Sequence, residues 1–198
     1  MWTGDTNSVF KTLGASNLAE ETRQVQDYYA TEPAAVELLL AEEQFSKNVW
    51  ECACGEGHMA EVLKGHGHNV RATDVVDRGY GGVRDFLFFN CDSFNGDIVT
   101  NPPYKKAQEF TEKALELVPR GGKVAMFLKL QFLEGKRRKL LFKKNPPKTL
   151  YVSSSRLLCA KNGDFDKART ELGAGAVAYA WFVWQKNYMG KTNIKWIN

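Results

Sequence analysis

The sequence lacks the features that would place it in a membrane or outside the cell. None of its apolar stretches approaches the roughly 20 residues of a membrane-spanning helix. Its opening residues, MWTGD, have neither the basic region nor the apolar core of a secretion signal. Its 198 residues, 43% of them hydrophobic and 25% charged, are ordinary for one globular domain with a sizeable core. We therefore expect a cytoplasmic protein with no membrane partner.

Cysteine and histidine are scarce, and neither forms a metal-binding pattern. The four cysteines are Cys52, Cys54, Cys91 and Cys159, and the three histidines are His58, His66 and His68. A single residue separates the first two cysteines, whereas a zinc clip usually has about two to four between its thiols. The histidines fall in a glycine-rich turn region, where polar loop positions are expected. The sequence predicts reduced thiols and no metal.

Acidic residues are missing from the segment Gly135–Lys148, which has seven basic residues. The net charge of the whole chain is only +4, so this concentration is local. One interpretation is a patch that contacts nucleic-acid phosphates, and the other is a solvated helix face. The predicted phosphate contacts are Lys136, Arg137, Arg138 and Lys139.

Short apolar strands alternate with amphipathic helices through most of the chain. The strands are predicted at 48–52, 69–73, 97–100 and 123–130, and the helices at 34–43, 59–64 and 107–118. This order predicts an α/β fold with a doubly wound, mostly parallel sheet. Segments 149–158 and 176–185 are both strand-like, with only a polar loop between them, which predicts an antiparallel hairpin at a sheet edge. Residues 1–27 are expected to form a polar arm, and 28–198 a single domain.

A complete Gly-x-Gly-x-x-Gly motif is also missing. The segment Glu51–Gly57 (ECACGEG) stands at a strand-to-helix turn, where Gly55 and Gly57 allow backbone to approach a ligand closely. Ala53 occupies the place of the first glycine, so a nucleoside ligand other than a dinucleotide is favoured. Asp74 follows the next strand, at the position where a carboxylate accepts hydrogen bonds from ribose hydroxyls. The alternative for Asp74 is a simple turn former at a strand end.

Two candidates for an adenine-binding carboxylate follow further along the chain. Asp85 precedes Phe86, so this pair offers an acceptor together with an aromatic wall for an adenine ring. Asp92 is the competing acceptor, and the sequence does not decide between Asp85 and Asp92.

Asn101-Pro102-Pro103-Tyr104 is the most informative segment of the chain. It follows a short apolar strand, and the prolines fix the exit path and remove two backbone donors. The Asn101 amide oxygen and the Pro102 carbonyl provide two acceptors, and Tyr104 provides a flat aromatic face. Together they suit a planar amine conjugated to a base or an amide. The alternative is a proline-stiffened turn with a surface tyrosine.

In this order, these motifs resemble the class I S-adenosylmethionine-dependent amino-methyltransferases. The resemblance is strongest to N6-adenine DNA methyltransferases, including the small single-domain kind of phages and prokaryotes, and it covers residues 28 to 133 or so. The segment Tyr29–Pro33 (YATEP) is similar to the family motif that precedes the glycine turn and helps to cover the methionine moiety. The sequence departs from the family at Cys52, where proline is frequent, and at Glu32, which separates Thr31 from Pro33.

The resemblance implies a set of site residues. The implied cofactor contacts are Tyr29, Thr31, Glu51, Ala53, Gly55, Gly57, Asp74, Asp85 and Phe86. Within this set the glycines would pack under S-adenosylmethionine, Glu51 would reach its amino group and Asp74 its ribose. Asp85 would contact the adenine amine while Phe86 stacks on the ring. Asn101, Pro102 and Tyr104 would hold the target base as the catalytic residues, and no cysteine would have a catalytic role.

The function that this resemblance implies is methyl transfer to the N6 amine of adenine in DNA. Three alternatives stay open: methylation of an RNA purine amine, methylation of a protein glutamine amide, and a catalytically silent nucleic-acid-binding module. No separate target-recognition domain is expected, so segments 135–148 and 159–175 are the candidates for contacts with DNA. The sequence does not indicate an oligomeric state or a recognition sequence.

Overall fold

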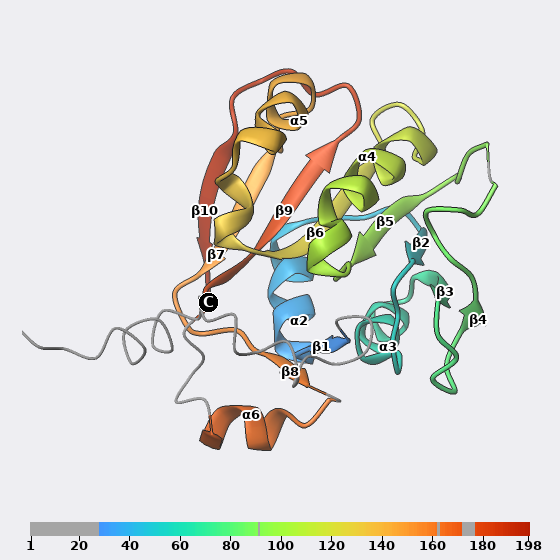
Figure 1. Ribbon diagram of the computed structural model, residues 1–198, viewed down its shortest axis with the longest axis vertical. Coiled ribbons are helices and arrows are strands. Elements are labelled where there is room, and N and C mark those ends of the chain that lie inside the picture. The colour runs from blue at the N-terminus through green and yellow to red at the C-terminus, as the bar shows by residue number, and fades with distance from the viewer. Residues whose placement is uncertain (1–27, 91, 162, 172–176) are drawn as a thin grey trace, which may run out of the picture.

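The computed structural model describes residues 28–90, 92–161, 163–171 and 177–198 (Figure 1). The predicted arm, residues 1–27, lies outside the described residues. The strands are β1 (Tyr29–Thr31), β2 (Asn48–Glu51), β3 (Asn69–Asp74), β4 (Gly82–Val83), β5 (Asp97–Thr100), β6 (Lys123–Lys129), β7 (Thr149–Ser153), β8 (Cys159–Lys161), β9 (Tyr179–Gln185) and β10 (Asn193–Ile197). The helices are α2 (Pro33–Glu42), α3 (His58–Gly65), α4 (Ala107–Leu117), α5 (Lys139–Lys144) and α6 (Phe165–Glu171), with 3₁₀ turns η3 (Tyr104–Lys106), η4 (Leu130–Leu133) and η5 (Lys136–Arg138).

The central sheet has eight strands in the order β10-β7-β9-β6-β5-β2-β3-β4. All neighbouring pairs are parallel except those made by β9, which runs antiparallel to both β6 and β7. Helices α2 and α3 cover one face, and α4 and α5 the other (Figure 1). The predicted doubly wound, mostly parallel α/β fold with an antiparallel C-terminal pair is therefore confirmed.

Consecutive apolar residues form the strands because both faces of the sheet are buried. In β2, Val49 packs toward α2 and α3, whereas the next residue, Trp50, packs toward α4. The buried indole nitrogens have partners. Trp50 Nε1 donates to Thr73 Oγ1 at 2.8 Å, and Trp181 Nε1 donates to the carbonyl of Ala35 at 2.7 Å. The sheet is therefore a two-sided core in which the polar groups of its largest side chains are satisfied.

The C-terminal third differs in detail from the prediction. Strands β7 and β9 pair as expected, but β10 adds in parallel outside β7, so the pair lies inside the sheet rather than at its edge. The segment predicted to be a polar loop contains β8 and α6. Strand β8 leaves the central sheet and pairs antiparallel with β1, with Thr31 opposite Cys159. A three-residue strand has too little pattern to be recognised in sequence.

No helix among the described residues combines the length and the apolar character that crossing a bilayer requires. In the same part of the chain, no three side chains of histidine, cysteine, aspartate or glutamate gather as a metal site.

The carboxylate of Asp97 joins three segments at the amino-terminal end of β5. It accepts hydrogen bonds from the backbone N–H of Ser46 at 2.6 Å and of Lys123 at 2.7 Å, and the residue is 5% exposed. Because Asp97→Ala leaves both N–H groups without their acceptor, we expect it to lower the free energy of unfolding by about 2–4 kcal/mol. Chemical denaturation measures this, and the exposed Asp92→Ala serves as a control with a change of about 0.5 kcal/mol or less. Equal effects in the two variants would contradict the assigned role.

Candidate functional site

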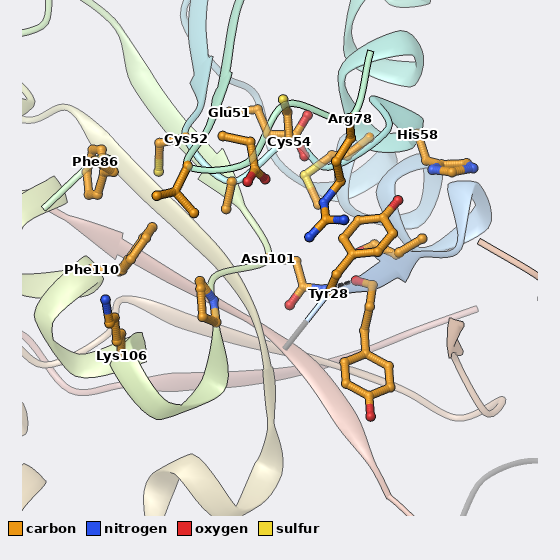
Figure 2. Close-up of a pocket in the computed structure, with 18 of the residues that line it drawn as sticks. Tyr28, Glu51, Cys52, Cys54, His58, Arg78, Phe86, Asn101, Lys106 and Phe110 are labelled. Atoms are coloured by element: carbon orange, nitrogen blue, oxygen red, sulfur yellow. Dashed lines mark hydrogen bonds between the residues drawn. The ribbon is translucent and has the colours of Figure 1, made fainter. Parts of the chain in front are cut away.

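A cavity of about 390 Å³ opens at the carboxyl ends of β2, β3 and β5. Strand order reverses between β2 and β5, and ligands of doubly wound folds bind at such a switch point. The volume lies in the range of small-molecule sites. The cavity is lined by all of the predicted cofactor contacts except Gly55 and Gly57, and also by Asn101. Side chains from four segments that are distant in sequence point into it (Figure 2).

The glycine turn connects β2 to α3 with two residues in left-handed backbone conformation. Gly55 has φ of 54° and Gly57 has φ of 87°, so other residues would be strained at either position. A Cβ atom on Gly55 would overlap the ring of Tyr28, and one on Gly57 would lie 2.5 Å from the ring of Tyr80. The glycines therefore make room for two tyrosine rings of the chain itself. Neither glycine is among the residues that line the cavity, and their predicted contact with a cofactor stays a prediction.

Asp74 connects the end of β3 to this turn. Its Oδ2 accepts from the N–H of Gly55 at 2.9 Å, and its Oδ1 accepts from the N–H of Val76 at 3.0 Å. The residue is 8% exposed and lines the cavity. A carboxylate oxygen has more than one lone pair, so Asp74 can fix the turn and still accept from a ligand.

Glu51 is the most unusual ionisable group in the cavity. It is 2% exposed, and its Oε2 is buried with no hydrogen-bond partner among the described residues. Burial raises the pKa of Glu51 well above its ordinary value, the charge of Asp74 raises it further, and a hydrogen bond from the Ala60 backbone partly offsets the shift. A buried carboxyl without a cation suits a positively charged or hydrogen-bond-donating ligand.

An aromatic wall forms one end of the cavity. Phe86 is 2% exposed and packs against Phe110 and Trp50, with ring centroids 5.0 and 5.3 Å apart. Asp85 lines this end and accepts from the N–H of Leu87 at 2.9 Å. Asp92, the competing candidate, is exposed and does not line the cavity. The geometry thus favours Asp85 as the acceptor beside a planar ring.

The Asn101 carboxamide lies at the side of the cavity with its orientation fixed by two hydrogen bonds. Its Nδ2 donates to the carbonyl of Tyr29 at 3.0 Å and to the sulfur of Cys159 at 3.8 Å. Its Oδ1 is buried and has no partner among the described residues. Asn101 therefore lines the cavity while its amide holds an acceptor with no partner in the described part of the chain, and Figure 2 shows the residue facing this space.

Tyr104 lies behind Asn101, outside the cavity lining. Its hydroxyl donates to the sulfur of Cys159 at 3.2 Å, and burial raises the pKa of Tyr104 well above its ordinary value. Burial also raises the pKa of the Cys159 thiol to about 12, so both groups are protonated at neutral pH. The ring of Tyr104 lies 6.3 Å from that of Tyr29, and the Lys129 ammonium is 4.7 Å from its centroid. A base that stacked on Tyr104 would have to displace at least one of these neighbours.

Of the two prolines between Asn101 and Tyr104, the one predicted to contact a ligand is not the one that lines the cavity. Pro102 is buried and does not line the cavity, whereas Pro103 does. The Pro103 carbonyl accepts from the N–H of Lys106 at 2.8 Å, which starts the turn η3.

The basic segment follows the turn η4, which comes after the carboxyl end of β6. Lys136, Arg137 and Lys139 are exposed. Arg138 is different, because its Nε donates to the carbonyl of Phe132 at 2.7 Å and its guanidinium also reaches the carbonyl of Glu134. The guanidinium of Arg138 is therefore engaged in closing its own turn, which leaves the other three as candidates for phosphate contacts.

Comparisons with known proteins find similarity in structure alone. No protein-family model and no curated protein matches the sequence. A proposed modification subunit of a type I restriction enzyme from Vibrio vulnificus YJ016 superposes with a TM-score of 0.61 at 13% identity, over 96% of this chain and 50% of that one. A proposed class I S-adenosylmethionine-dependent methyltransferase from Listeria monocytogenes gives 0.59 at 12% identity, over 94% of this chain and 72% of that one. A TehB-like methyltransferase from Corynebacterium glutamicum gives 0.52 at 14% identity, over 77% and 87%.

The chain therefore has a Rossmann-like fold of the kind found in these methyltransferases. It spans about half the length of the first of these structures. Within this methyltransferase fold, the cavity and its carboxylates occupy the edge of the sheet where ligands of doubly wound folds bind.

Among the residues that line or support the cavity and were not predicted from sequence, three make specific contacts within the site. Tyr28 covers the glycine turn, Arg78 lies along the Tyr28 ring, and Cys159 contacts both Asn101 and Tyr104. Nothing near Arg78 or Cys159 in sequence marks either of them.

The raised pKa of Glu51 leads to a prediction about stability. Because the folded pKa exceeds the unfolded value of about 4.5, stability falls as pH rises through the interval between them. Glu51→Gln removes this titration, so its melting temperature in the ligand-free protein should exceed that of the wild type increasingly as pH rises above 4.5. Calorimetry over pH 4 to about 8 measures the difference. The exposed Glu116→Gln should follow the wild type throughout, and a pH-independent difference for Glu51→Gln would contradict the assignment.

Proposed function

We propose that this protein transfers a methyl group from S-adenosylmethionine to the exocyclic N6 amine of adenine in DNA. The observation that carries the proposal is the placement of Asn101, a cavity-lining residue whose buried Oδ1 has no partner among the described residues. A buried acceptor without a donor costs stability, so its retention beside a ligand-sized cavity indicates a donor that arrives with the substrate. An aromatic amine is such a donor.

Three features of the cavity suit three parts of the proposed cofactor. The orphaned carboxyl of Glu51 suits the cofactor ammonium, the Asp74 carboxylate suits ribose hydroxyls, and the wall at Phe86 suits an adenine ring. When bound, the cofactor supplies an electrophilic methyl group on a sulfonium that leaves as a neutral thioether.

The protein's part is alignment and hydrogen bonding. Asn101 Oδ1 would accept a hydrogen bond from the target amine and favour a nitrogen whose lone pair is localised rather than delocalised into the ring. Holding amine and cofactor in line can supply roughly 7–11 kcal/mol of the barrier. No thiolate is required, in agreement with the raised pKa of Cys52, Cys54 and Cys159.

Two observations support DNA as the acceptor. The exposed basic residues Lys136, Arg137 and Lys139 follow η4 after β6, the strand that neighbours β5 in the sheet. The first comparison structure is described as a modification subunit of a restriction enzyme. In a duplex, the target base would swing out of the stack at a cost of a few kcal/mol and displace Tyr29 or Lys129 from the ring of Tyr104.

Labelled cofactor tests the proposal directly. Methyl incorporation into DNA, RNA and protein should be found in DNA alone, with N6-methyladenine in the digested product. Label in RNA or in glutamine residues would show that the acceptor is RNA or protein rather than DNA. Cofactor binding without incorporation into any of the three would identify a silent binding module.

Asn101→Ala removes the acceptor without removing a cofactor contact. We expect methyl transfer to fall by roughly 10²-fold or more, the loss typical of removing one preorganised hydrogen-bonding group from an active site. The affinity for S-adenosylhomocysteine, measured by calorimetry, should change less than about threefold. The exposed Asn95→Ala is the matched control and should keep both quantities. Parallel losses of transfer and cofactor affinity in Asn101→Ala would contradict the separate roles.

Replacing Lys136, Arg137 and Lys139 by glutamine tests the basic segment. If each contacts a phosphate, DNA affinity should fall most at low salt, and the slope of log K against log salt concentration should become shallower by roughly 2 to 3. Fluorescence anisotropy over a salt series measures the slope. Gln substitution at the exposed Lys191 should leave it unchanged. An unaltered slope in the triple variant would assign these residues to a solvated face.

A further inference from the structure

Arg78 lines the cavity, and its charge has no ion-pair partner among the described residues. It follows the end of β3 in the loop that leads to β4, and its guanidinium lies over the ring of Tyr28, 4.2 Å from the centroid. Its Nε is buried and has no hydrogen-bond partner within the described residues. No ion pair joins it to a carboxylate in the same part of the chain, although Glu51 and Asp74 line the same cavity. Figure 2 shows Arg78 extending beside Tyr28 toward the middle of the cavity.

The position of the Arg78 guanidinium is determined by Tyr28. The hydroxyl of Tyr28 accepts from the N–H of Glu56 at 3.2 Å, which holds the ring on the glycine turn where Gly55 leaves room for it. Burial raises the pKa of Tyr28 to about 12, so the ring stays neutral and offers its face to a cation. The two residues thus form an anchored cation whose Nε has no acceptor among the described residues.

The proposed cofactor carries one charged group for which the site described so far provides no oppositely charged partner. Its amino-acid part holds an ammonium and a carboxylate, and Glu51 suits the ammonium alone. Two other cations line the cavity, Lys105 and Lys106, but both are exposed. Lys106 lies beside Phe110 at the aromatic end, away from Arg78 (Figure 2). Arg78 is therefore the cation on the polar side of the cavity.

We propose that Arg78 binds the α-carboxylate of S-adenosylmethionine, with Tyr28 as the residue that positions it. This inference rests on the cofactor assigned above. A planar guanidinium can donate two parallel hydrogen bonds to a carboxylate, which gives both affinity and direction. Arg78 and Glu51 together then recognise the zwitterionic end of the cofactor, and they distinguish it from nucleosides that lack an amino-acid part.

The test compares two ligands that differ by one group. S-adenosylhomocysteine carries the carboxylate, and its decarboxylated analogue keeps the ammonium and lacks the carboxylate. Calorimetry without nucleic acid should show that Arg78→Gln loses roughly 10- to 100-fold in affinity for the first ligand. Its affinity for the analogue should stay within about twofold, because the group that Arg78 contacts is missing. Arg78→Lys keeps the charge but loses the planar pair of N–H donors. Its affinity for S-adenosylhomocysteine should therefore lie between those of the wild type and Arg78→Gln.

Arg84 provides a matched control. It is an exposed arginine that lies against the ring of Phe89, 4.5 Å from the centroid, and it does not line the cavity. Arg84→Gln should leave both affinities unchanged. Tyr28→Ala should repeat the selective loss of Arg78→Gln, since it removes the support of the guanidinium.

Each other outcome has a definite meaning. Equal losses for both ligands in Arg78→Gln, or no loss for either, would overturn the carboxylate assignment while leaving the cofactor intact. A loss confined to DNA affinity, with a shallower salt dependence, would assign Arg78 to a nucleic-acid phosphate instead. If the wild type binds neither ligand, the cofactor itself is wrong and this inference falls with it.

Discussion

The candidate acceptor site depends on the pairing between β1 and β8. This short two-stranded sheet places Cys159 opposite Thr31 and brings it within hydrogen-bonding distance of Asn101 and Tyr104. The carbonyl of Tyr29, also in β1, takes the second hydrogen bond from the Asn101 amide. Three segments far apart in sequence therefore have to meet before the Asn101 carboxamide is fixed at the side of the cavity. The orientation of one carboxamide is a tertiary property, and the Asn-Pro-Pro-Tyr motif alone does not set it.

Much of the fold and the nucleoside end of the site could be predicted from sequence. Glu51, Asp74 and Asn101 each stand at the end of an apolar strand that is followed by a helix or a loop. Parallel strands bring their carboxyl ends to the same edge of a sheet, so the convergence of these side chains follows from the α/β pattern itself. The confirmed doubly wound sheet and the cavity at its switch point are products of that rule.

The parts that could not be predicted depend on long-range contacts or on weak patterns. Cys159 and Arg78 are defined by neighbours that are distant in sequence, so no spacing identifies them. Strand β10 places Ile194 and Trp196 in exposed positions, so its alternation does not resemble a half-buried strand. The basic run shows a further limit, because Arg138 turns inward to carbonyls while its neighbours stay exposed. Composition shows that basic residues are present, but only the folded structure shows which of them are exposed and able to contact a ligand.

The antiparallel pair β6–β9 determines which connections of the chain can change in length or sequence. Lys129 at the end of β6 is paired directly with Tyr179 at the start of β9, and β7 pairs with β9 as well. The connection from β6 to β7 and the connection from β7 to β9 therefore have both their ends fixed by strand pairing. Doubling the length of a flexible connection raises its closure entropy cost by only about 0.6 kcal/mol. The exposed positions from η4 to α5 can therefore change or take insertions without moving the nucleoside cavity, whereas Phe132 and Leu141 are buried in the core. The connection that contains β8 can vary less, because Cys159 must stay within hydrogen-bonding distance of Asn101.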